Sequence, residues 1–274
     1  MPRWKPPTNS PPSARRADLE EEPPILRGDL AVLHADEHLL IVDKPAGMWL
    51  GDAPEDEPSV EGRLAALGLL DRHGPPPAAV VPLDMQASGV CVLTPHPDGM
   101  APLREQLAQG AMEIRHLVLV RGRAAAASGT IEQHLAERDG GQTTQVVAED
   151  RGVAAMTLWR LRDQFVGFAL LECIPRTAVR QQLRAHLAAS GMSPAVDAAY
   201  GGGERLMLSS IKANYRPSRR HPELPLIRRL SIHAESVTMT HPATAAVLRF
   251  EARMPKDFRA ALHQLDKYGR LPTP

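Results

Sequence analysis

Short apolar runs separated by polar turns recur along this 274-residue chain, and their spacing predicts strands that pair as hairpins. Residues 31–47 show a strand, a polar turn and a second strand that ends at a Pro-Ala-Gly stop. Residues 154–174 hold two apolar stretches on either side of Asp163-Gln164, which predicts a hairpin that turns there. Further strands are predicted at residues 90–93, 117–122, 231–237 and 247–252.

Apolar residues recur with helical spacing in four other segments, which are residues 59–70, 100–109, 180–190 and 256–267. In the third of these, Leu183 and Leu187 lie four positions apart, and Gly191 is a suitable C-terminal stop. Strands therefore outnumber helices and come mostly as hairpins. This pattern predicts the α+β class.

The composition changes near residue 28. Residues 1–27 are rich in proline, arginine and glutamate, which predicts a disordered tail, and residues 28–274 are expected to form one folded domain. The 32 basic and 32 acidic residues cancel, so any attraction to nucleic acid must come from local patches. No apolar run is long enough to span a bilayer and no secretory signal is seen, so we expect a cytoplasmic protein.

Cysteine and histidine usage gives no sign of a metal site. Cys91 and Cys173 lie within apolar runs and are expected to be buried, reduced thiols rather than a disulfide. Cysteines and histidines nowhere show the spacing of metal ligands, so no metal is expected.

The first candidate for chemistry is Asp84, a lone carboxylate in a turn of small residues. The apolar run Val90–Leu93 that follows predicts a buried strand, which places the turn at the end of a sheet. A buried carboxylate without a partner is costly, so Asp84 is either paired or used as a nucleophile or general base. The alternative is that Asp84 only tightens the turn, and this segment taken alone favours that alternative.

The second candidate is the start of the predicted helix at 180–190, where Arg180, Arg184 and His186 crowd together. The dipole at that end of a helix disfavours cations, so the arrangement indicates an anionic partner such as the Asp84 carboxylate or a phosphate. The alternative is an amphipathic surface helix with its leucines turned inward.

Six segments resemble, in order, the motifs of the RluA-type (RsuA/RluA-like) family of RNA pseudouridine synthases, and they span nearly everything after residue 30. They are the opening hairpin Asp36–Met48, the catalytic-aspartate motif Leu83-Asp84 with Ser88-Gly89, the strand Leu117–Gly122, the arginine helix Gln182–Ala188, the loop Asp197–Gly202, and the C-terminal strands with Ile232-His233-Ala234, His241-Pro242 and Phe250-Glu251-Ala252. Each motif alone is weak, but six in the right order are specific. The resemblance implies a mixed, mainly antiparallel sheet with flanking helices.

The resemblance also implies an activity, the isomerisation of uridine in RNA to pseudouridine without a cofactor. Asp84 would be the catalytic acid at C1′ of the target ribose, and Arg184 would pair with it and keep it ionised. His116 stands at the position of the family's active-site aromatic residue, where an imidazole can stack on uracil and move protons near neutral pH. Family members often carry an S4-like RNA-binding domain upstream, for which residues 1–27 are too short and too proline-rich.

Several positions depart from the family's pattern and indicate a divergent member. Val81 and Pro82 replace a His-Arg pair whose arginine helps to extrude the target base, and Ala87 replaces a threonine. Val179 stands where the segment before the arginine helix usually has an arginine, so Arg180 is expected to take over that role. Base flipping is therefore expected to differ from that of the family.

RNA, either ribosomal or transfer, is the expected partner of a protein that by default is a monomer. The helix start offers Arg180 and Gln182 for RNA contact. The basic, proline-containing segment 205–229 combines positive charges with one ring, a mix suited to phosphate contact and stacking. Its candidate residues are Lys212, Tyr215, Arg216, Arg219 and Arg220. The alternative for this segment is a solvated basic loop.

Three functions remain open on sequence alone. We favour an active but divergent RNA pseudouridine synthase that uses Asp84. The second is a catalytically impaired RNA-binding protein that keeps the synthase fold. The third is another carboxylate enzyme such as a hydrolase, which ranks last because no second carboxylate motif supports it. Arg184 within reach of Asp84, with His116 facing the same cleft, would favour the first function, and a cleft filled by Pro82 or Met85 would favour the second.

Overall fold

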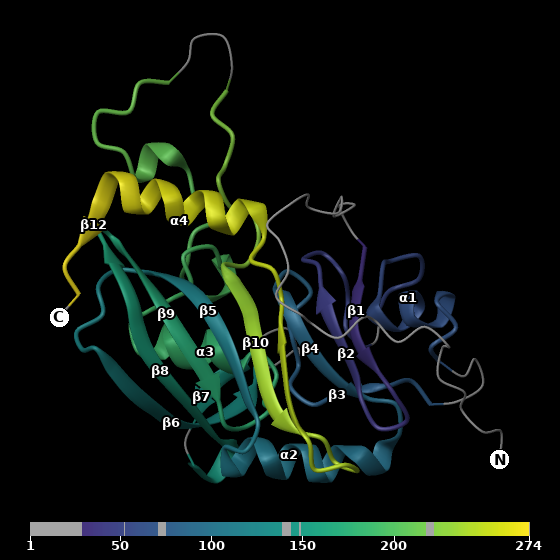
Figure 1. Cartoon of the computed structure of the whole chain (residues 1–274). Coiled ribbons are helices and arrows are strands. Elements are labelled where there is room, and N and C mark those ends of the chain that lie inside the picture. The colour runs from purple at the N-terminus through teal and green to yellow at the C-terminus, as the bar shows by residue number, and fades with distance from the viewer. Residues whose placement is uncertain are drawn as a thin grey trace.

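The computed structural model describes residues 29–51, 53–70, 75–138, 144–147, 149–217 and 222–273. Within them, twelve strands form one mixed sheet with four α-helices around it, which confirms the predicted α+β class (Figure 1). The tail predicted for residues 1–27 lies outside the described residues. None of the described helices is long and apolar enough to cross a membrane.

The helices and hairpins lie close to where the apolar pattern predicted them. The strands are, in chain order, β1 (Ala31–Ala35), β2 (Leu40–Lys44), β3 (Ala78–Ala79), β4 (Ser88–Thr94), β5 (Glu113–Arg121), β6 (Ser128–Glu137), β7 (Thr144–Val147), β8 (Val153–Phe165), β9 (Phe168–Pro175), β10 (Ile232–Thr240), β11 (Val247–Glu251) and β12 (Arg270–Leu271). The helices are α1 (Val60–Ala66), α2 (Met100–Gln109), α3 (Gln182–Ala189) and α4 (Lys256–Gly269).

The sheet consists of two antiparallel halves that meet at one short parallel contact. The strand order is β1-β2-β4-β10-β5-β9-β8-β6-β7, with β3 beside β4, β11 beside β10 and β12 beside β8. Among the described strands, only β4 and β10 pair in parallel. Their contact comprises two residue pairs, Ser88 with His233 and Gly89 with Ala234, which we call the seam.

The seam is tight because Gly89 has no side chain. Its φ is +114°, and a Cβ built at this position would overlap the backbone of Ala234. Beside it, the Oγ of Ser88 lies 3.1 Å from Nδ1 of His233, and both side chains are buried. The Ser-Gly pair of the aspartate motif therefore joins the two half-sheets.

Two apolar clusters cover the two faces of the sheet. On β5, Val118 and Val120 contribute to the larger cluster, whereas Leu117 and Leu119 point to the other face and pack under α4. Figure 1 shows α4 and α2 at opposite ends of the sheet. Cys91 and Cys173 are buried in the larger cluster as free thiols, as predicted, and burial raises the pKa of Cys91 to about 12.

One predicted turn is displaced. The β8–β9 hairpin turns at Val166-Gly167, where Gly167 has a φ of +75°, and not at Asp163-Gln164. Gln164 is buried, and its amide nitrogen donates to the carbonyl of Phe168 at 2.8 Å. The prediction was wrong because backbone groups satisfy this polar side chain inside the strand.

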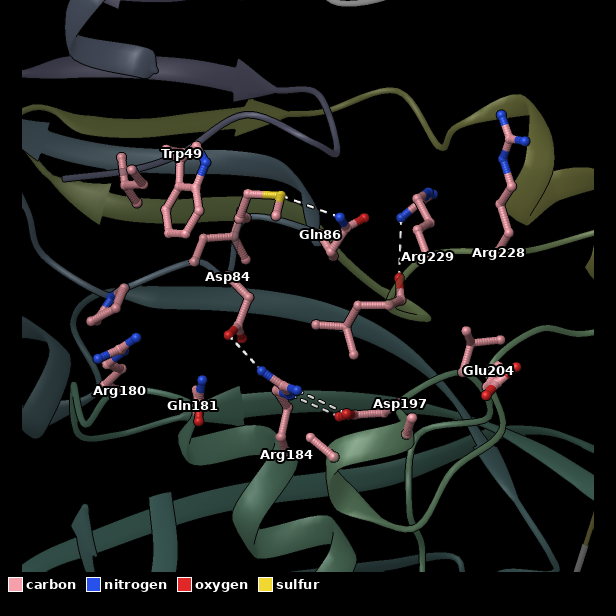
Figure 2. A pocket seen from close by; sticks show the side chains of 18 of the residues that line it. Trp49, Asp84, Gln86, Arg180, Gln181, Arg184, Asp197, Glu204, Arg228 and Arg229 are labelled. Carbon is pink, nitrogen blue, oxygen red and sulfur yellow. Dashed lines mark hydrogen bonds and ion pairs between the residues drawn. The ribbon is translucent and has the colours of Figure 1, made fainter. Parts of the chain in front are cut away.

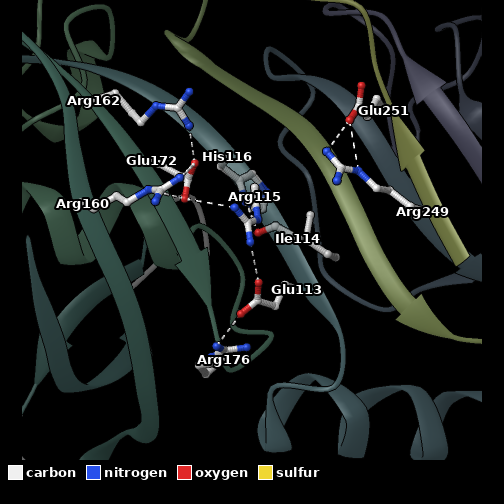
Figure 3. A network of polar contacts seen from close by, with 10 residues as sticks. All are labelled: Glu113, Ile114, Arg115, His116, Arg160, Arg162, Glu172, Arg176, Arg249 and Glu251. Atoms are coloured by element: carbon white, nitrogen blue, oxygen red, sulfur yellow. Dashed lines mark hydrogen bonds and ion pairs between the residues drawn. The ribbon is translucent and has the colours of Figure 1, made fainter. Parts of the chain in front are cut away.

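Arginines and glutamates pair with one another across β5, β8 and β9 (Figure 3). The nearly buried Glu172 accepts hydrogen bonds from Arg160 at 2.9 Å and from Arg162 at 2.6 Å. Burial raises the pKa of Glu172, but these hydrogen bonds outweigh it and hold the pKa below its usual value. These arginines and glutamates therefore largely neutralise one another, which is typical of cross-strand ion pairs.

Replacing Gly89 by alanine is expected to lower the free energy of unfolding by about 2 kcal/mol or more, because the new Cβ forces the seam apart. Urea denaturation followed by circular dichroism measures this loss. Gly122→Ala is the matched control, since Gly122 also has a positive φ, +88°, but its Cβ would meet nothing within 4 Å. Equal losses in the two variants would show that the contact at the seam is not tight.

Candidate active site

Asp84 lies in the turn that leads into β4, next to the seam. Backbone groups close this turn, since the Ala87 N–H donates to the Asp84 carbonyl at 3.0 Å. The Asp84 side chain is 21% exposed, so the carboxylate can be reached from solvent. The turn therefore leaves the carboxylate available for another partner.

Lys44 fixes the Asp84 turn from beneath. Its side chain is fully buried, and its ammonium group is within hydrogen-bond distance of four carbonyl oxygens. Two belong to the loop after β2, Pro45 at 3.1 Å and Met48 at 3.0 Å, and two belong to the Asp84 turn, Met85 at 3.0 Å and Ala87 at 2.7 Å. Burial lowers the pKa of Lys44 to about 8. One buried cation thus ties the two loops together.

The predicted pairing of Arg184 with Asp84 is present, and a second carboxylate shares the same guanidinium (Figure 2). Nη1 of Arg184 donates to Oδ1 of Asp84 at 2.8 Å. Nε and Nη2 donate to the two carboxylate oxygens of Asp197, at 2.7 and 2.8 Å. This bidentate contact fixes the plane of the guanidinium, so the remaining nitrogen points at Asp84.

Tyr200 supports the guanidinium from one face. Its ring centroid lies 4.6 Å from the central carbon of Arg184, a distance suited to a cation–π contact. The Tyr200 hydroxyl accepts from the Thr144 N–H at 2.8 Å and lies 2.7 Å from Oε1 of Gln181. Arg184 is therefore held at its edge by Asp197 and on its face by Tyr200.

Charges near Asp84 set its proton affinity. Burial raises the pKa of Asp84 above its usual value, and the negative charge of Asp197 adds to this rise. Arg184, and more weakly Lys44, act in the opposite direction. The two cations therefore offset only part of the effect of burial and of Asp197, and the pKa of Asp84 stays above its usual value.

A cavity of about 610 Å³ opens at this pair, within the usual range of small-molecule sites, about 300–1,000 Å³. Figure 2 shows Trp49 and Arg180 toward one end of the cavity and Arg228 toward the other. Pro82 and Met85 line the wall and do not fill the cavity.

A family model described as RNA pseudouridylate synthase matches residues 38–189. The chain belongs to this family. Ribosomal large subunit pseudouridine synthase D of Xanthomonas campestris pv. campestris is 30% identical over 241 residues, which cover 86% of this chain and 69% of the relative. Ribosomal large subunit pseudouridine synthase C of Salmonella typhi is 28% identical over 270 residues, which cover 93% of this chain and 77% of the relative.

Solved structures share the fold of this synthase. Human RNA Pseudouridylate Synthase Domain Containing 4 superimposes with a TM-score of 0.60 at 20% identity, over 89% of this chain and 95% of the human chain. Human RNA Pseudouridylate Synthase Domain Containing 1 gives 0.57 at 16% identity, over 91% of each chain. The predicted fold is thereby confirmed. The family assignment makes the protein an isomerase that converts uridine in RNA to pseudouridine, as predicted.

His116 does not line the large cavity beside Asp84 and Arg184. It lines a separate space of about 20 Å³ that also touches Asp84. Its Nδ1 lies 3.2 Å from the carbonyl of Ile114, and burial lowers the pKa of His116 to about 4. The predicted stacking on uracil and proton transfer near neutral pH do not fit this place, because the ring is enclosed and uncharged at pH 7.

Of the two residues predicted for RNA contact at the helix start, Arg180 lines the cavity and Gln182 does not contact it. Gln182 is 4% exposed, and its amide nitrogen donates to the Met156 carbonyl at 2.8 Å and to Thr157 Oγ1 at 3.0 Å. Its amide oxygen accepts from Thr177 Oγ1 at 2.8 Å. The prediction for Gln182 was wrong, since this side chain fixes the start of α3 inside the protein.

The structure places the predicted residues of segment 205–229 away from the cavity wall, as far as it describes them. Lys212, Tyr215 and Arg216 are not among the lining residues, and Arg219 and Arg220 lie outside the described residues.

The end of this segment does reach the cavity. Arg228 is exposed and lines it. Arg229 also lines it, but its guanidinium donates to both oxygens of Asp257, at 2.7 and 2.9 Å. Arg228 is therefore the better placed of the two for a phosphate.

A cluster that the sequence spacing did not reveal is His34, Asp36 and His241, whose ligand-type atoms lie within 4.8 Å of one another. The Nε2 atoms of the two rings lie 2.6 and 2.8 Å from Oδ2 of Asp36. Nδ1 of His241 accepts from the N–H groups of Ala243 and Thr244, so the neutral ring carries its proton on Nε2 and donates it to Asp36. This hydrogen-bonding pattern suits a clamp between β1 and the β10–β11 turn better than a metal site.

Replacing Asp197 by asparagine is expected to reduce turnover roughly 100-fold, because Arg184 loses the contact that aims it. Removal of the neighbouring negative charge also lowers the pKa of Asp84. Activity that needs ionised Asp84 is lost as the pH falls through this pKa, so the acid limb should move to lower pH. Release of tritium from RNA labelled at uracil C5 gives the profile.

The matched control for this experiment is Asp257→Asn, which breaks an equivalent bidentate contact with Arg229. It should leave the position of the acid limb unchanged. An acid limb that stays in place in Asp197→Asn, while the melting temperature falls, would leave Asp197 with a structural role only.

Proposed function

We propose that Asp84 is the carboxylate through which this synthase acts on C1′ of the target uridine, and that Arg184 keeps it ionised and oriented. The observation that carries the proposal is the 2.8 Å contact between the two side chains at the wall of an open cavity. A carboxylate suits this chemistry because it can form a covalent sugar adduct and can also stabilise positive charge at C1′.

In the proposed reaction, Asp84 either attacks C1′ or assists elimination, and the bond between C1′ and N1 of uracil breaks. The released uracil turns, and a bond forms between C5 and C1′. The proton at C5 is then lost and N1 gains one, so the overall change is an isomerisation. Because C1′ and C5 must both be reached, the nucleotide has to leave its stack and enter the cavity.

The geometry favours an active enzyme over a catalytically impaired RNA-binding protein. The ion pair of Asp84 with Arg184 is intact, although neighbouring positions differ from the family's pattern. Pro82 and Met85 leave the cavity open. A hydrolase that uses two carboxylates has less support, because Asp197 is turned toward Arg184 with a side chain only 1% exposed.

We propose ribosomal RNA of the large subunit as the substrate, modified in the cytoplasm. The support is that each of the two bacterial relatives is named a ribosomal large subunit pseudouridine synthase. Transfer RNA is the second candidate.

The RNA contacts of this proposal lie at the ends of the cavity. Arg180 is 56% exposed and lines the cavity, so its guanidinium can be reached by a phosphate there. Arg228 flanks the other end. Segment 205–229 would extend the contact through Lys212, Tyr215 and Arg216, and through Arg219 and Arg220.

Deletion of the gene should remove pseudouridine from one position of large-subunit ribosomal RNA. The wild-type gene should restore it and Asp84→Asn should not, because the amide cannot act at C1′ as a carboxylate does. Pseudouridine mapping of total RNA measures this. A map that is unchanged when the protein is known to be made in the wild type would contradict the substrate, and restoration by Asp84→Asn would contradict the role of Asp84.

Arg228→Ala is expected to weaken binding of ribosomal RNA and to make it less dependent on salt. Each lost phosphate contact lowers the slope of log affinity against log salt by about 0.7 for single strands. Filter binding between about 50 and 200 mM salt measures the slope. Arg249→Ala is the control, since Arg249 pairs with Glu251 on β11 and does not line the cavity. Parallel salt curves for wild type and Arg228→Ala would exclude a phosphate contact.

A further inference from the structure

The two described tryptophans differ in what surrounds them. Trp159 packs against the larger apolar cluster. Trp49 packs against none of the apolar clusters found in the described residues, and its ring is partly exposed at the cavity. A large ring outside the core and inside a site indicates contact with a ligand more than support of the fold.

The backbone of Trp49 is held in place on both sides. Its N–H donates to the carbonyl of Pro58 at 2.8 Å, and its carbonyl accepts from the N–H of Val60 at 2.9 Å. The preceding residue, Met48, is fixed through its carbonyl by Lys44 at 3.0 Å. The loop that carries the ring is therefore rigid. This rigidity reduces the conformational entropy that is lost when the ring binds a partner.

Trp49 is the one aromatic ring among the described residues that line the cavity. The rest of the wall is made of carboxylates, guanidinium groups, glutamine amides, proline, methionine, glycine and aliphatic side chains. His116, which the sequence placed at the active-site ring position, is enclosed behind Asp84. A nucleotide that leaves its stack thus finds one flat π surface here.

We propose that Trp49 is the stacking platform for a nucleobase of the bound RNA, next to the cations that hold the phosphates. The inference rests on the proposed function, since it names how the same cavity holds its substrate. Stacking uses the face of a base, which every base has, so Trp49 contributes affinity without reading sequence. Arg180, toward the same end of the cavity, is placed for the adjoining phosphate (Figure 2).

The test titrates wild type, Trp49→Phe and Trp49→Ala with the RNA oligomer U12 and follows tryptophan emission and affinity. U12 should quench wild-type emission, and most of this change should be absent in both variants. Trp49→Ala should bind U12 about tenfold more weakly, and Trp49→Phe should retain most of the affinity because its ring also stacks. Inorganic polyphosphate, which has charge but no bases, should bind all three proteins equally without quenching.

Two further readouts separate binding from folding and from chemistry. Thermal melting of Trp49→Ala should match wild type closely, because the ring is not part of the core. With RNA labelled at uracil C5, Trp49→Ala should raise KM and change kcat little.

Equal affinity of wild type and Trp49→Ala for U12, or quenching of tryptophan emission by polyphosphate, would contradict the proposal that Trp49 stacks on a nucleobase. Either result leaves the proposed function intact, provided that pseudouridine formation still depends on Asp84. Loss of that dependence overturns the proposed function itself, whatever Trp49 does.

Discussion

The active site depends on the two residue pairs of the seam, Ser88 with His233 and Gly89 with Ala234, because they hold the two half-sheets together. Asp84 belongs to the half-sheet built from β1 to β4, and Arg184 and Asp197 follow β9 in the other half. Among the described strands, backbone pairing joins the halves only where Ser88 and Gly89 of β4 meet β10. The distance between Asp84 and Arg184 therefore depends on the close approach that Gly89 permits, only five positions after the carboxylate. The Ser-Gly pair has a structural reason to follow the aspartate so closely.

Groups of the protein itself, and not the substrate, hold the charged side chains of the site in place. Lys44 is surrounded by carbonyl oxygens, and Arg184 is fixed by Asp197 and Tyr200. Of the two carboxylates that contact Arg184, Asp84 has a side chain that is 21% exposed at the cavity, whereas that of Asp197 is 1% exposed. Preorganised charges need little rearrangement if positive charge develops at C1′, as the proposed reaction requires.

Local patterns in the sequence predicted the hairpins, the helices and the two charged partners, Asp84 and Arg184. These signals are local because strand and helix periods, and motif order, can be read within a short window. What could not be predicted depends on contacts between distant segments. Lys44 reads as the polar end of a strand until it meets the Asp84 turn 41 residues later. Gln182 reads as a surface residue, and His116 as a pocket residue, until the packing around them is known.

The two cysteines of the chain give the enzyme a practical property. Cys91 and Cys173 are buried, and the raised pKa of about 12 keeps Cys91 protonated at neutral pH, so it is a poor nucleophile toward maleimides. A cysteine introduced on the surface would then be the one readily labelled thiol, with both native residues left in place. Fluorophores or spin labels could be attached at chosen points, and the movement of RNA across the protein could be followed in real time.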